Sequence, residues 1–507
     1  MEYGVLLNLV RWYRLFAQKV FYLRDEFSGS GVTVPDRMSA NDTSVTVLFT
    51  VDSLRADAFT SDGVVAALGE RGTTFENAFA HGNWTPFSFP SILGAKQVFT
   101  DSRGIGVADA PTLAETLSEA GVSTAGFNGA NGFLTEHWGY DRGFDEFETF
   151  TSGTGDSLYS KYLTAHPTVQ AWLQVVTSPV RRLLGQKGGA KNISRMLDVE
   201  RSAIDFVERA EPPFFLWVHY MDVHTPYVPA PKFVRDETGA NVGSLKMLRA
   251  HLRAGLGREV GHDALADLES LYRAAVRQVD ESVGRVLSAL DRRGFRDDAC
   301  VVLAGDHGEE FMEHGHLAHY PKLYEELTHV PFIVQHPDDK KQSADRKSVQ
   351  QAVGLASIPA TICDAMGVEH DFSAPSLLDA VVESGSETDP GAPGDTTPIT
   401  SVAVRGEHVT RQPIPRHLDD GELLVSARTA EWSYIYHTDS ENRELYDRRR
   451  DPTEQDNLWD EYEGSELASR LHDAVETRIE RIETDGDDES GDVPSEVSNQ
   501  LKALGYQ

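Results

Sequence analysis

Cysteine, lysine and long apolar runs are scarce in this chain of 507 residues. The two cysteines, Cys300 and Cys363, are too few for a disulfide framework or a four-thiolate metal site, and they fit a reducing compartment such as the cytoplasm. No stretch approaches the roughly 18 consecutive apolar residues of a membrane-spanning helix. With 40% hydrophobic and 25% charged residues, the composition excludes collagen-like, coiled-coil and wholly disordered chains.

Positive charge is also scarce, because 80 Asp and Glu face 47 Lys and Arg and give a formal net charge of −33 at pH 7. Only 12 of the basic residues are Lys. Such a surface repels itself unless salt screens it, so the composition predicts a halophilic protein; an ordinary acidic cytoplasmic protein is the alternative. Because the field is negative, we expect no nucleic-acid partner.

The chain divides by composition into parts of different character. Residues 1–25 break from the acidic background with basic residues and an apolar face at helical spacing. This amphipathic helix either packs against the domain or a partner subunit, or lies on an anionic membrane surface through residues 1–24. The remaining parts that we expect are a linker over 26–43, a catalytic domain over 44–380, a linker over 381–398, a C-terminal subdomain over 399–483 and an acidic tail over 484–507.

Apolar, β-branched runs alternate with helical patterns through the expected catalytic domain. The predicted strands cover residues 45–51, 123–127, 214–219, 299–304 and 331–334, and the predicted helices cover 112–120, 199–209 and 265–293. This alternation predicts an α/β fold with a doubly wound, largely parallel central sheet flanked by helices. Short strand patterns at 423–428 and 432–437, followed by a helix near 464–484, predict a smaller C-terminal α+β subdomain.

Residues that suit metal binding follow the predicted strands, where ligands of α/β sheets bind. Asp52 follows the first strand, and Asp306 and His307 follow the strand over 299–304. Carboxylate oxygen and imidazole nitrogen together suit a divalent cation. Taken alone, Asp52 could equally cap a turn or a helix.

Further histidines and hydroxyls lie near strand and helix ends. His224 follows another strand, and His314 and His319 come shortly after His307; a lone histidine is usually structural, but several at strand ends favour a site. The segment NWTPFSFPS at 83–91 places hydroxyls just before a predicted helix, whose N-terminus favours anions. One of these hydroxyls can become a nucleophile if a metal stabilises its alkoxide.

Several sequence blocks, taken in their order along the chain, resemble the sulfatase family of the alkaline phosphatase superfamily. They are VDSLRAD at 51–57, FENAF at 75–79, VHYMDVHTP at 218–226, GDHGE at 305–309, EHG at 313–315, LYEE at 323–326 and the late ELYD, DPTE and NL blocks between 444 and 458. The resemblance covers residues from about 45 to 460.

The resemblance implies an ester hydrolase with one divalent metal ion: Ca, Mg, Mn or Zn. It implies Asp52, Asp306 and His307 as metal ligands, Thr85 as nucleophile and further ligand, and His224 as the group at the leaving oxygen. The implied substrate-binding residues are Ser88, Asn128, Asn131, His314 and His319.

The chain departs from true sulfatases at the nucleophile. Those enzymes carry Cys or Ser in a C/S-x-P-x-R pattern and convert it to formylglycine, whereas this chain has Thr85 and lacks the arginine, with Phe89 in its place. Threonine resembles the phosphoglycerol-transferase and phosphodiesterase branches instead. A threonine has no second hydroxyl with which to expel sulfate, so we expect a small-molecule or glycan phosphate or sulfate ester, with phosphate preferred. An arylsulfatase-type enzyme and an inactive ester- or glycan-binding protein are the alternatives.

Overall fold

The computed structural model describes ten stretches of the chain, and these carry all that follows. They are residues 43–58, 62–100, 104–108, 110–150, 196–225, 227–239, 261–337, 347–382, 397–405 and 421–483. The predicted N-terminal helix, the predicted acidic tail and nearly all of both predicted linkers lie outside these residues.

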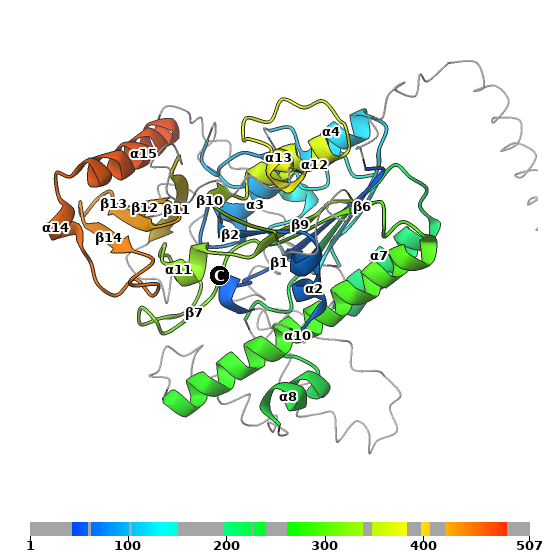
Figure 1. Ribbon diagram of the computed structural model, residues 1–507, viewed down its shortest axis with the longest axis horizontal. Coiled ribbons are helices and arrows are strands. Elements are labelled where there is room, and N and C mark those ends of the chain that lie inside the picture. The colour runs from blue at the N-terminus through cyan, green and yellow to red at the C-terminus, as the bar shows by residue number, and fades with distance from the viewer. Residues whose placement is uncertain are drawn as a thin grey trace, which may run out of the picture. The chain divides into compact units, whose positions relative to one another are not determined.

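An eight-stranded sheet forms the centre of the catalytic domain, with strand order β10-β2-β9-β6-β1-β5-β3-β4 (Figure 1). Its strands are β1 (Val45–Val51), β2 (Thr73–Phe79), β3 (Ser123–Asn128), β4 (Glu146–Glu148), β5 (Phe214–Tyr220), β6 (Ala299–Gly305), β9 (Phe332–Gln335) and β10 (Lys347–Gly354). Only β9 runs antiparallel to its neighbours. The prediction of a largely parallel sheet is confirmed.

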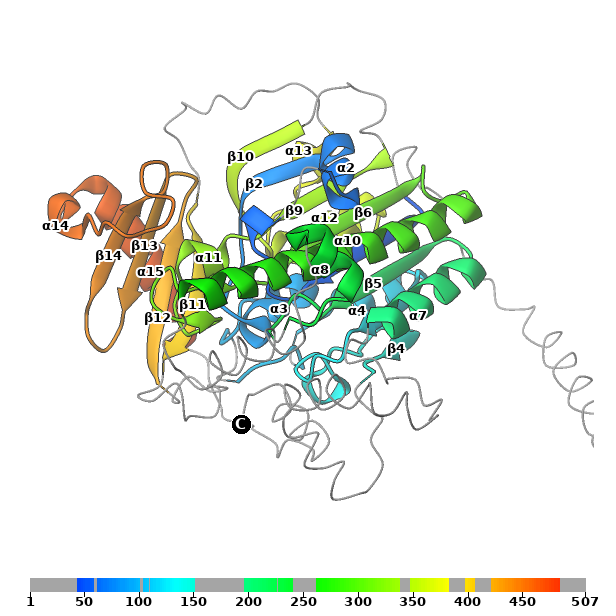
Figure 2. The same cartoon turned by 90° about the horizontal axis from the view of Figure 1, so that it is seen from below.

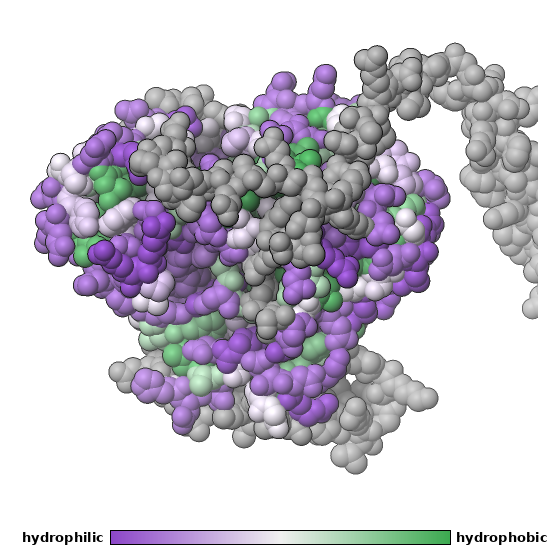
Figure 3. Space-filling view, in the orientation of Figure 1, coloured by the Kyte–Doolittle hydropathy of each residue, from purple (hydrophilic) through white to green (hydrophobic). Residues whose placement is uncertain are grey.

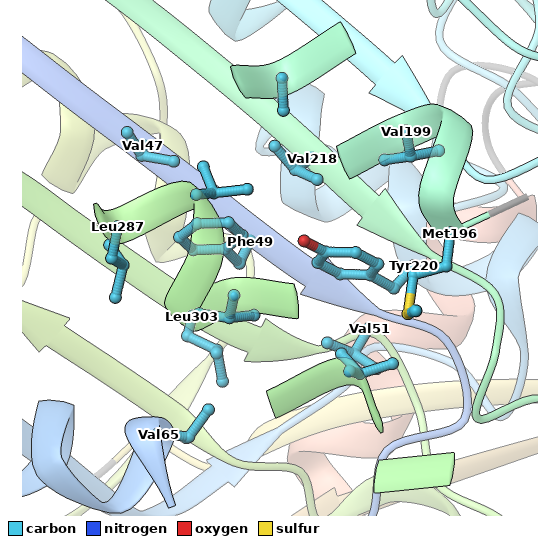
Figure 4. Close-up of a cluster of buried hydrophobic side chains, with 14 of the residues drawn as sticks. Val47, Phe49, Val51, Val65, Met196, Val199, Val218, Tyr220, Leu287 and Leu303 are labelled. Atoms are coloured by element: carbon cyan, nitrogen blue, oxygen red, sulfur yellow. The ribbon is translucent and has the colours of Figure 1, made fainter. Parts of the chain in front are cut away.

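The central strands can be buried on both faces because their side chains are either apolar or hydrogen-bonded. All seven residues of β1 are buried, and its parallel partners β5 and β6 are equally covered. On one face, Phe49 and Tyr220 pack beneath α7 (Met196–Arg209), α10 (His262–Arg293) and α2 (Val64–Arg71) (Figure 4). Figure 2 shows α10 and α7 lying across the strands on this face, with α8 (Pro231–Thr238) against α10.

The other face of the sheet carries a second core. Side chains such as Leu48, Trp217 and Phe332 pack there against helices that Figure 1 shows on the opposite side from α10. These helices are α3 (Thr85–Gly94), α4 (Leu113–Glu119), α12 (Ser357–Ala365) and α13 (Leu378–Val382). Helices on both faces make the sheet doubly wound, as the sequence predicted.

A four-stranded antiparallel sheet with one long helix forms the C-terminal subdomain. Its order is β11 (Ile399–Arg405), β12 (Glu422–Arg428), β13 (Trp432–His437) and β14 (Arg443–Asp447), with α14 (Trp459–Tyr462) and α15 (Glu466–Glu483) beside it. A bridge between Gly82 and Val402 joins it to the catalytic domain, and the Ser401 hydroxyl donates to the Ala80 carbonyl at 2.6 Å. A two-stranded ribbon of β7 (Glu310–Phe311) and β8 (Leu317–Ala318), the short helix α11 (Glu325–Thr328) and 3₁₀ turns at Ala56–Ala58 and Glu136–Trp138 complete the described elements.

Three strands of the central sheet, β2, β4 and β10, escaped the sequence analysis, and β4 has only three residues. The β2 strand carries Glu76 and Asn77 within its apolar run, and β10 at the sheet edge is mostly polar. Tertiary pairing rather than local pattern places them. No helix in the described stretches is long and apolar enough to cross a membrane. The described surface on the face shown in Figure 3 is largely hydrophilic, in keeping with the high charge.

Candidate active site

The ends of the central strands bring the predicted chemical residues together. Val51 pairs with Tyr220 of β5 and with Gly305 of β6 in the same register. The residues that follow β1 and β6, Asp52 and Asp306, are therefore neighbours at the carboxyl edge of the sheet. Both are fully buried, as is His307.

Asp52 lies at the centre of the group and holds its partners by hydrogen bonds. Its Oδ2 accepts from the Thr85 hydroxyl at 3.1 Å and from the Asn131 amide at 2.9 Å. Its Oδ1 accepts from the Ser53 hydroxyl at 3.1 Å and lies 3.5 Å from His307 Nε2. His219, at the end of β5, approaches Oδ2 to 3.6 Å.

Asp52, Asp306 and His307 fit a divalent cation. One ligand atom from each lies within 4.8 Å of the others. Asp306 Oδ2 and His307 Nε2 are buried and make no hydrogen bond among the described residues, whereas burial normally demands a partner. His307 Nδ1 contacts the Gly308 carbonyl at 2.8 Å, so Nδ1 carries the proton and Nε2 offers its lone pair. Two hard oxygens and one imidazole nitrogen form a suitable set for such an ion.

The backbone beside these ligands is unusually constrained. Ser53 adopts a left-handed φ of 58°, which directs its amide to Asp306 Oδ1 at 3.1 Å. Gly308 passes so close to α11 that a Cβ there would lie 1.9 Å from the Glu326 carbonyl oxygen. These two residues fix the turns after β1 and β6 and hence the positions of the ligands.

Thr85 is the first residue of α3, a helix in which all ten residues are buried. Pro86 suits this first turn because it has no amide hydrogen to leave unpaired. Phe89 packs edge-on against His219 with ring centroids 5.0 Å apart. A helix locked on all sides presents the Thr85 hydroxyl to Asp52 in a fixed direction.

A turn after β3 supplies an amide to the same point. Asn128 is buried and donates to the carbonyls of Asn131 and Leu134, both at 2.8 Å. Held in this way, Asn131 donates to Asp52 and lies 3.2 Å from the Thr85 oxygen. Asn131 therefore belongs to the set of side chains around Asp52, whereas Asn128 stabilises the turn that carries Asn131.

His224 and His319 lie beside His307 at the edge of the group. Their rings lie 5.0 Å apart, and His319 is 5.2 Å from His307, centroid to centroid. His224 Nδ1 contacts the Thr225 carbonyl at 2.5 Å, so Nδ1 carries a proton. His319 Nδ1 lies 3.9 Å from Glu309, a fully buried carboxyl group.

Burial and crowded charge shift the pKa values in this group in opposite directions. Burial alone raises the pKa of Asp52, but His224, His219 and His307 outweigh it and hold this pKa well below its usual range. Burial and the Asp52 charge raise the pKa of Asp306. His307 resists the effect of burial because Asp306 and Asp52 raise its pKa to about 9. A pocket that attracts a proton this strongly also attracts a cation.

The neighbouring histidines behave differently from His307. Burial, together with the His307 charge, lowers the pKa of His319 to about 3, and burial lowers the pKa of His224. Burial raises the pKa of Glu309 to about 7. Near neutral pH the site therefore contains strongly perturbed acids and bases, as functional sites commonly do.

Two predicted substrate residues lie elsewhere or make no contact with the group. His314 contacts Glu326 at 2.7 Å and the Glu454 carbonyl at 3.0 Å, and it stacks on Tyr324, so it belongs to the junction with the C-terminal subdomain. Ser88 lies one turn beyond Thr85, and its buried hydroxyl makes no hydrogen bond among the described residues.

Sequence reasoning missed His219 and Glu309. Their positions were the available signals, because His219 ends a buried strand within the VHYMDVHTP block and Glu309 ends the GDHGE block. Neither stands out, because each looks like a structural residue when taken alone.

The comparisons with known proteins agree with this fold. The Sulfatase family model matches residues 44–368, more than half of the chain. The chain belongs to the sulfatase family.

Curated relatives resemble the chain over part of their length. It is 24% identical over 303 residues to the uncharacterized sulfatase YidJ of Escherichia coli, covering 56% of this chain and 55% of that protein. It is 27% identical over 223 residues to an N-acetylglucosamine-6-O-sulfatase of Bacteroides thetaiotaomicron, covering 43% of this chain and 37% of the relative. The chain thus spans about half, or less, of the curated relatives that it matches.

Solved structures share the fold over most of the chain. The phosphonate monoester hydrolase of Agrobacterium radiobacter matches with a TM-score of 0.62 and 16% identity, covering 86% of this chain and 95% of that one. A protein solved in complex with its substrate D-glucosamine-2-N,6-O-disulfate matches with a TM-score of 0.62 and 17% identity, covering 89% and 100%. At such identities the likeness shows the fold alone.

Proposed function

We propose that this chain is a metal-dependent hydrolase of phosphate esters that uses Thr85 as a covalent nucleophile. The observation that carries the proposal is the Thr85 hydroxyl at the buried start of α3, 3.1 Å from Asp52 Oδ2 and next to the Asp306–His307 pair. Thr85 also stands where a sulfatase would carry the precursor of formylglycine. The natural substrate is a small-molecule or glycan ester.

The residues that would bind the metal ion at this site are Asp52, Asp306 and His307. A divalent cation there supplies positive charge that stabilises the anionic oxygens of the ester and favours ionisation of the Thr85 hydroxyl. Asn131, which donates to Asp52 and lies 3.2 Å from the Thr85 oxygen, holds these two side chains in register. The Ser53 amide and hydroxyl orient Asp306 and Asp52 in the same way.

The chemistry assigned to the chain's own residues is a double displacement. Thr85 gives up its hydroxyl proton toward Asp52, and its Oγ1 forms a bond to phosphorus while the bond from phosphorus to the alcohol oxygen breaks. His224 protonates the departing oxygen through Nε2. Burial lowers the pKa of free His224, but the negative charge of a bound ester raises it again. Water then attacks phosphorus and gives a proton to His224, the bond from phosphorus to Oγ1 breaks, and Thr85 regains its proton from Asp52. An acceptor alcohol in place of water would give transfer.

The second candidate function is sulfate-ester hydrolysis. It is favoured by the family model and by the curated relatives, several of which carry the name sulfatase. In this function, water must attack the sulfur atom of the Thr85 sulfate ester. A threonine ester, unlike that of a formylglycine hydrate, cannot release sulfate by forming an aldehyde.

A substrate panel with matched variants tests both candidates. The purified chain, supplied in turn with Mg²⁺, Mn²⁺, Ca²⁺ and Zn²⁺, is assayed on aryl phosphodiester, phosphomonoester, phosphonate and sulfate substrates. We expect the phosphoesters to be favoured and Thr85→Ala to lose on the order of 10³-fold or more in kcat. Ser88→Ala, one turn along the same buried helix, is the control and should keep the wild-type rate.

Two results would overturn the assignment. Near wild-type turnover in Thr85→Ala would show that another group attacks. A higher kcat/KM on sulfate than on phosphate esters would establish the second candidate, and no turnover on any substrate with any of the four ions would favour a binding protein.

A further inference from the structure

A cavity of about 790 Å³ lies at the carboxyl end of α3, between the catalytic sheet and α15. Gly94 and Ala95 from the end of α3, Gly354 from β10 and Ser357 from α12 contribute to its walls. Figure 1 shows α3, β10, β11 and α15 following one another at this junction. Thr85 lies at the opposite end of α3, about 15 Å away by the length of a ten-residue helix, so the cavity is separate from the candidate active site.

Basic side chains line this cavity, although the net charge of the whole chain is strongly negative. Lys96, Arg478 and Arg481 line it, with Asp371 as the one acidic side chain among its described lining residues. Arg478 is 3% exposed and is held by the Val98 carbonyl and the Thr100 hydroxyl. A buried guanidinium needs a negative partner or full hydrogen bonding to repay its lost hydration.

Arg478 has neither within the described part of the chain. No described carboxylate pairs with it, and its Nε is buried without a hydrogen-bond partner there. Burial and the nearby charge of Arg481 lower the pKa of Arg478 to about 10. Two neighbouring guanidinium groups that destabilise each other in this way form a site for an oxyanion.

His81 adds an acceptor to the same cavity. Its Nδ1 lies 2.8 Å from the Thr400 carbonyl and 2.9 Å from the Gln97 amide. The carbonyl can only accept, so Nδ1 carries a proton, while burial and the Arg478 charge lower the pKa of His81 to about 4 and keep the ring neutral. The buried Nε2 is therefore a bare acceptor, and it has no partner among the described residues. A Cβ at Gly354 would lie 2.5 Å from it, so only glycine fits beside this nitrogen.

We propose that the cavity binds a small hydroxylated oxyanion, of the class of sugar sulfates and sugar phosphates. The anionic group lies against Arg478 and Arg481, and a hydroxyl donates to His81 Nε2. The volume falls within the range of small-molecule sites. Because its walls come from both the catalytic sheet and α15, occupancy joins the two and stabilises the folded chain.

Calorimetric titration of the full chain with glucose 6-sulfate tests the proposal. Thr85→Ala serves as the background so that the probe is not consumed, and inorganic sulfate and glucose are the comparison probes at fixed ionic strength. Glucose 6-sulfate should bind more tightly than sulfate, and glucose should bind least. An Asp306→Asn arm identifies any binding event that belongs to the candidate active site.

Arg481→Gln should weaken the cavity's binding event about fivefold or more, as loss of a partly exposed charge-assisted contact implies. Arg470→Gln removes the same charge from an exposed position on α15 outside the cavity and should leave the affinity unchanged. Gly354→Ala, which crowds His81 Nε2, should remove the advantage of glucose 6-sulfate over sulfate.

Three outcomes would overturn the proposal. The first is that Asp306→Asn shows no remaining binding of glucose 6-sulfate. The second is an equal loss of affinity in Arg481→Gln and Arg470→Gln, and the third is equal affinity for sulfate and glucose 6-sulfate in the background chain. Thermal midpoints of Arg481→Gln and Arg470→Gln, which should match the background within error without the probe, separate lost binding from lost folding.

Discussion

Glu325 joins the two sheets of the molecule, and its replacement by glutamine gives a sharp test of the buried ionic network. Its Oε2 accepts from Arg428 at 2.8 Å and from Arg448 Nε at 2.8 Å, and its Oε1 accepts from Arg448 Nη2 at 2.7 Å. His329 approaches Oε1 to 2.8 Å. Arg428 is fully buried, and Arg448 and Glu325 are 6% and 17% exposed at their side chains.

The expected loss of stability depends on the partners that Arg428 and Arg448 retain in Glu325→Gln. Removing one partner from a buried ion pair commonly costs about 3–5 kcal/mol. Arg428 retains Glu454 at 2.9 Å, Arg448 retains Asn77 at 2.9 Å, and the glutamine retains one acceptor oxygen. The loss should therefore lie at the lower end, about 3 kcal/mol in the free energy of unfolding.

Urea unfolding followed by circular dichroism measures this loss through the shift of the midpoint at constant slope. Glu431→Gln is the matched control, because Glu431 pairs with Arg449 at 2.6 Å on the surface, with side chains 43% and 60% exposed. It should cost less than about 1 kcal/mol. A loss in Glu325→Gln no larger than in the control would refute the view that this network holds the sheets together.

Three further predictions concern the metal, acid and salt. Asp306→Asn should lower the content of bound divalent metal, whereas the exposed Asp364→Asn should keep it; stoichiometric metal in Asp306→Asn would place the ion elsewhere. Burial alone would raise the pKa of Glu444, but His437, Tyr446 and Tyr324 lower it below its usual 4.5, so its stabilisation is present above that value and is lost as the pH falls through the folded pKa. The cost of Glu444→Gln in unfolding experiments should thus be larger at pH 7 than at pH 3, and an equal cost at both would disprove the shift. The thermal midpoint of the full chain should rise from low to molar KCl, since the Debye length falls to about 3 Å at 1 M, and a midpoint independent of salt would remove the halophile hypothesis.

Local sequence determined the central strands and much of the site chemistry. A run such as VTVLFTV at 45–51 has an apolar or β-branched side chain at every position, which only a strand buried on both faces accommodates, and the polar residue that follows it must lie at the strand's end. Asp52, Asp306 and His307 can therefore be recognised as one group from the sequence. The family's block order supplied Thr85 and His224.

Tertiary structure decided what depends on residues far apart in the chain. His314 and His319 are five positions apart and alike in sequence, yet one stacks on Tyr324 at the junction of the sheets and the other faces His307. The lack of a partner for Arg478 Nε and for His81 Nε2 among the described residues is likewise invisible in the sequence, because it depends on which side chains α15, β10 and β11 leave beside them. A sequence pattern reports the environment that a residue prefers, whereas hydrogen-bond satisfaction is a property of the packed neighbours, and only the folded chain brings those together.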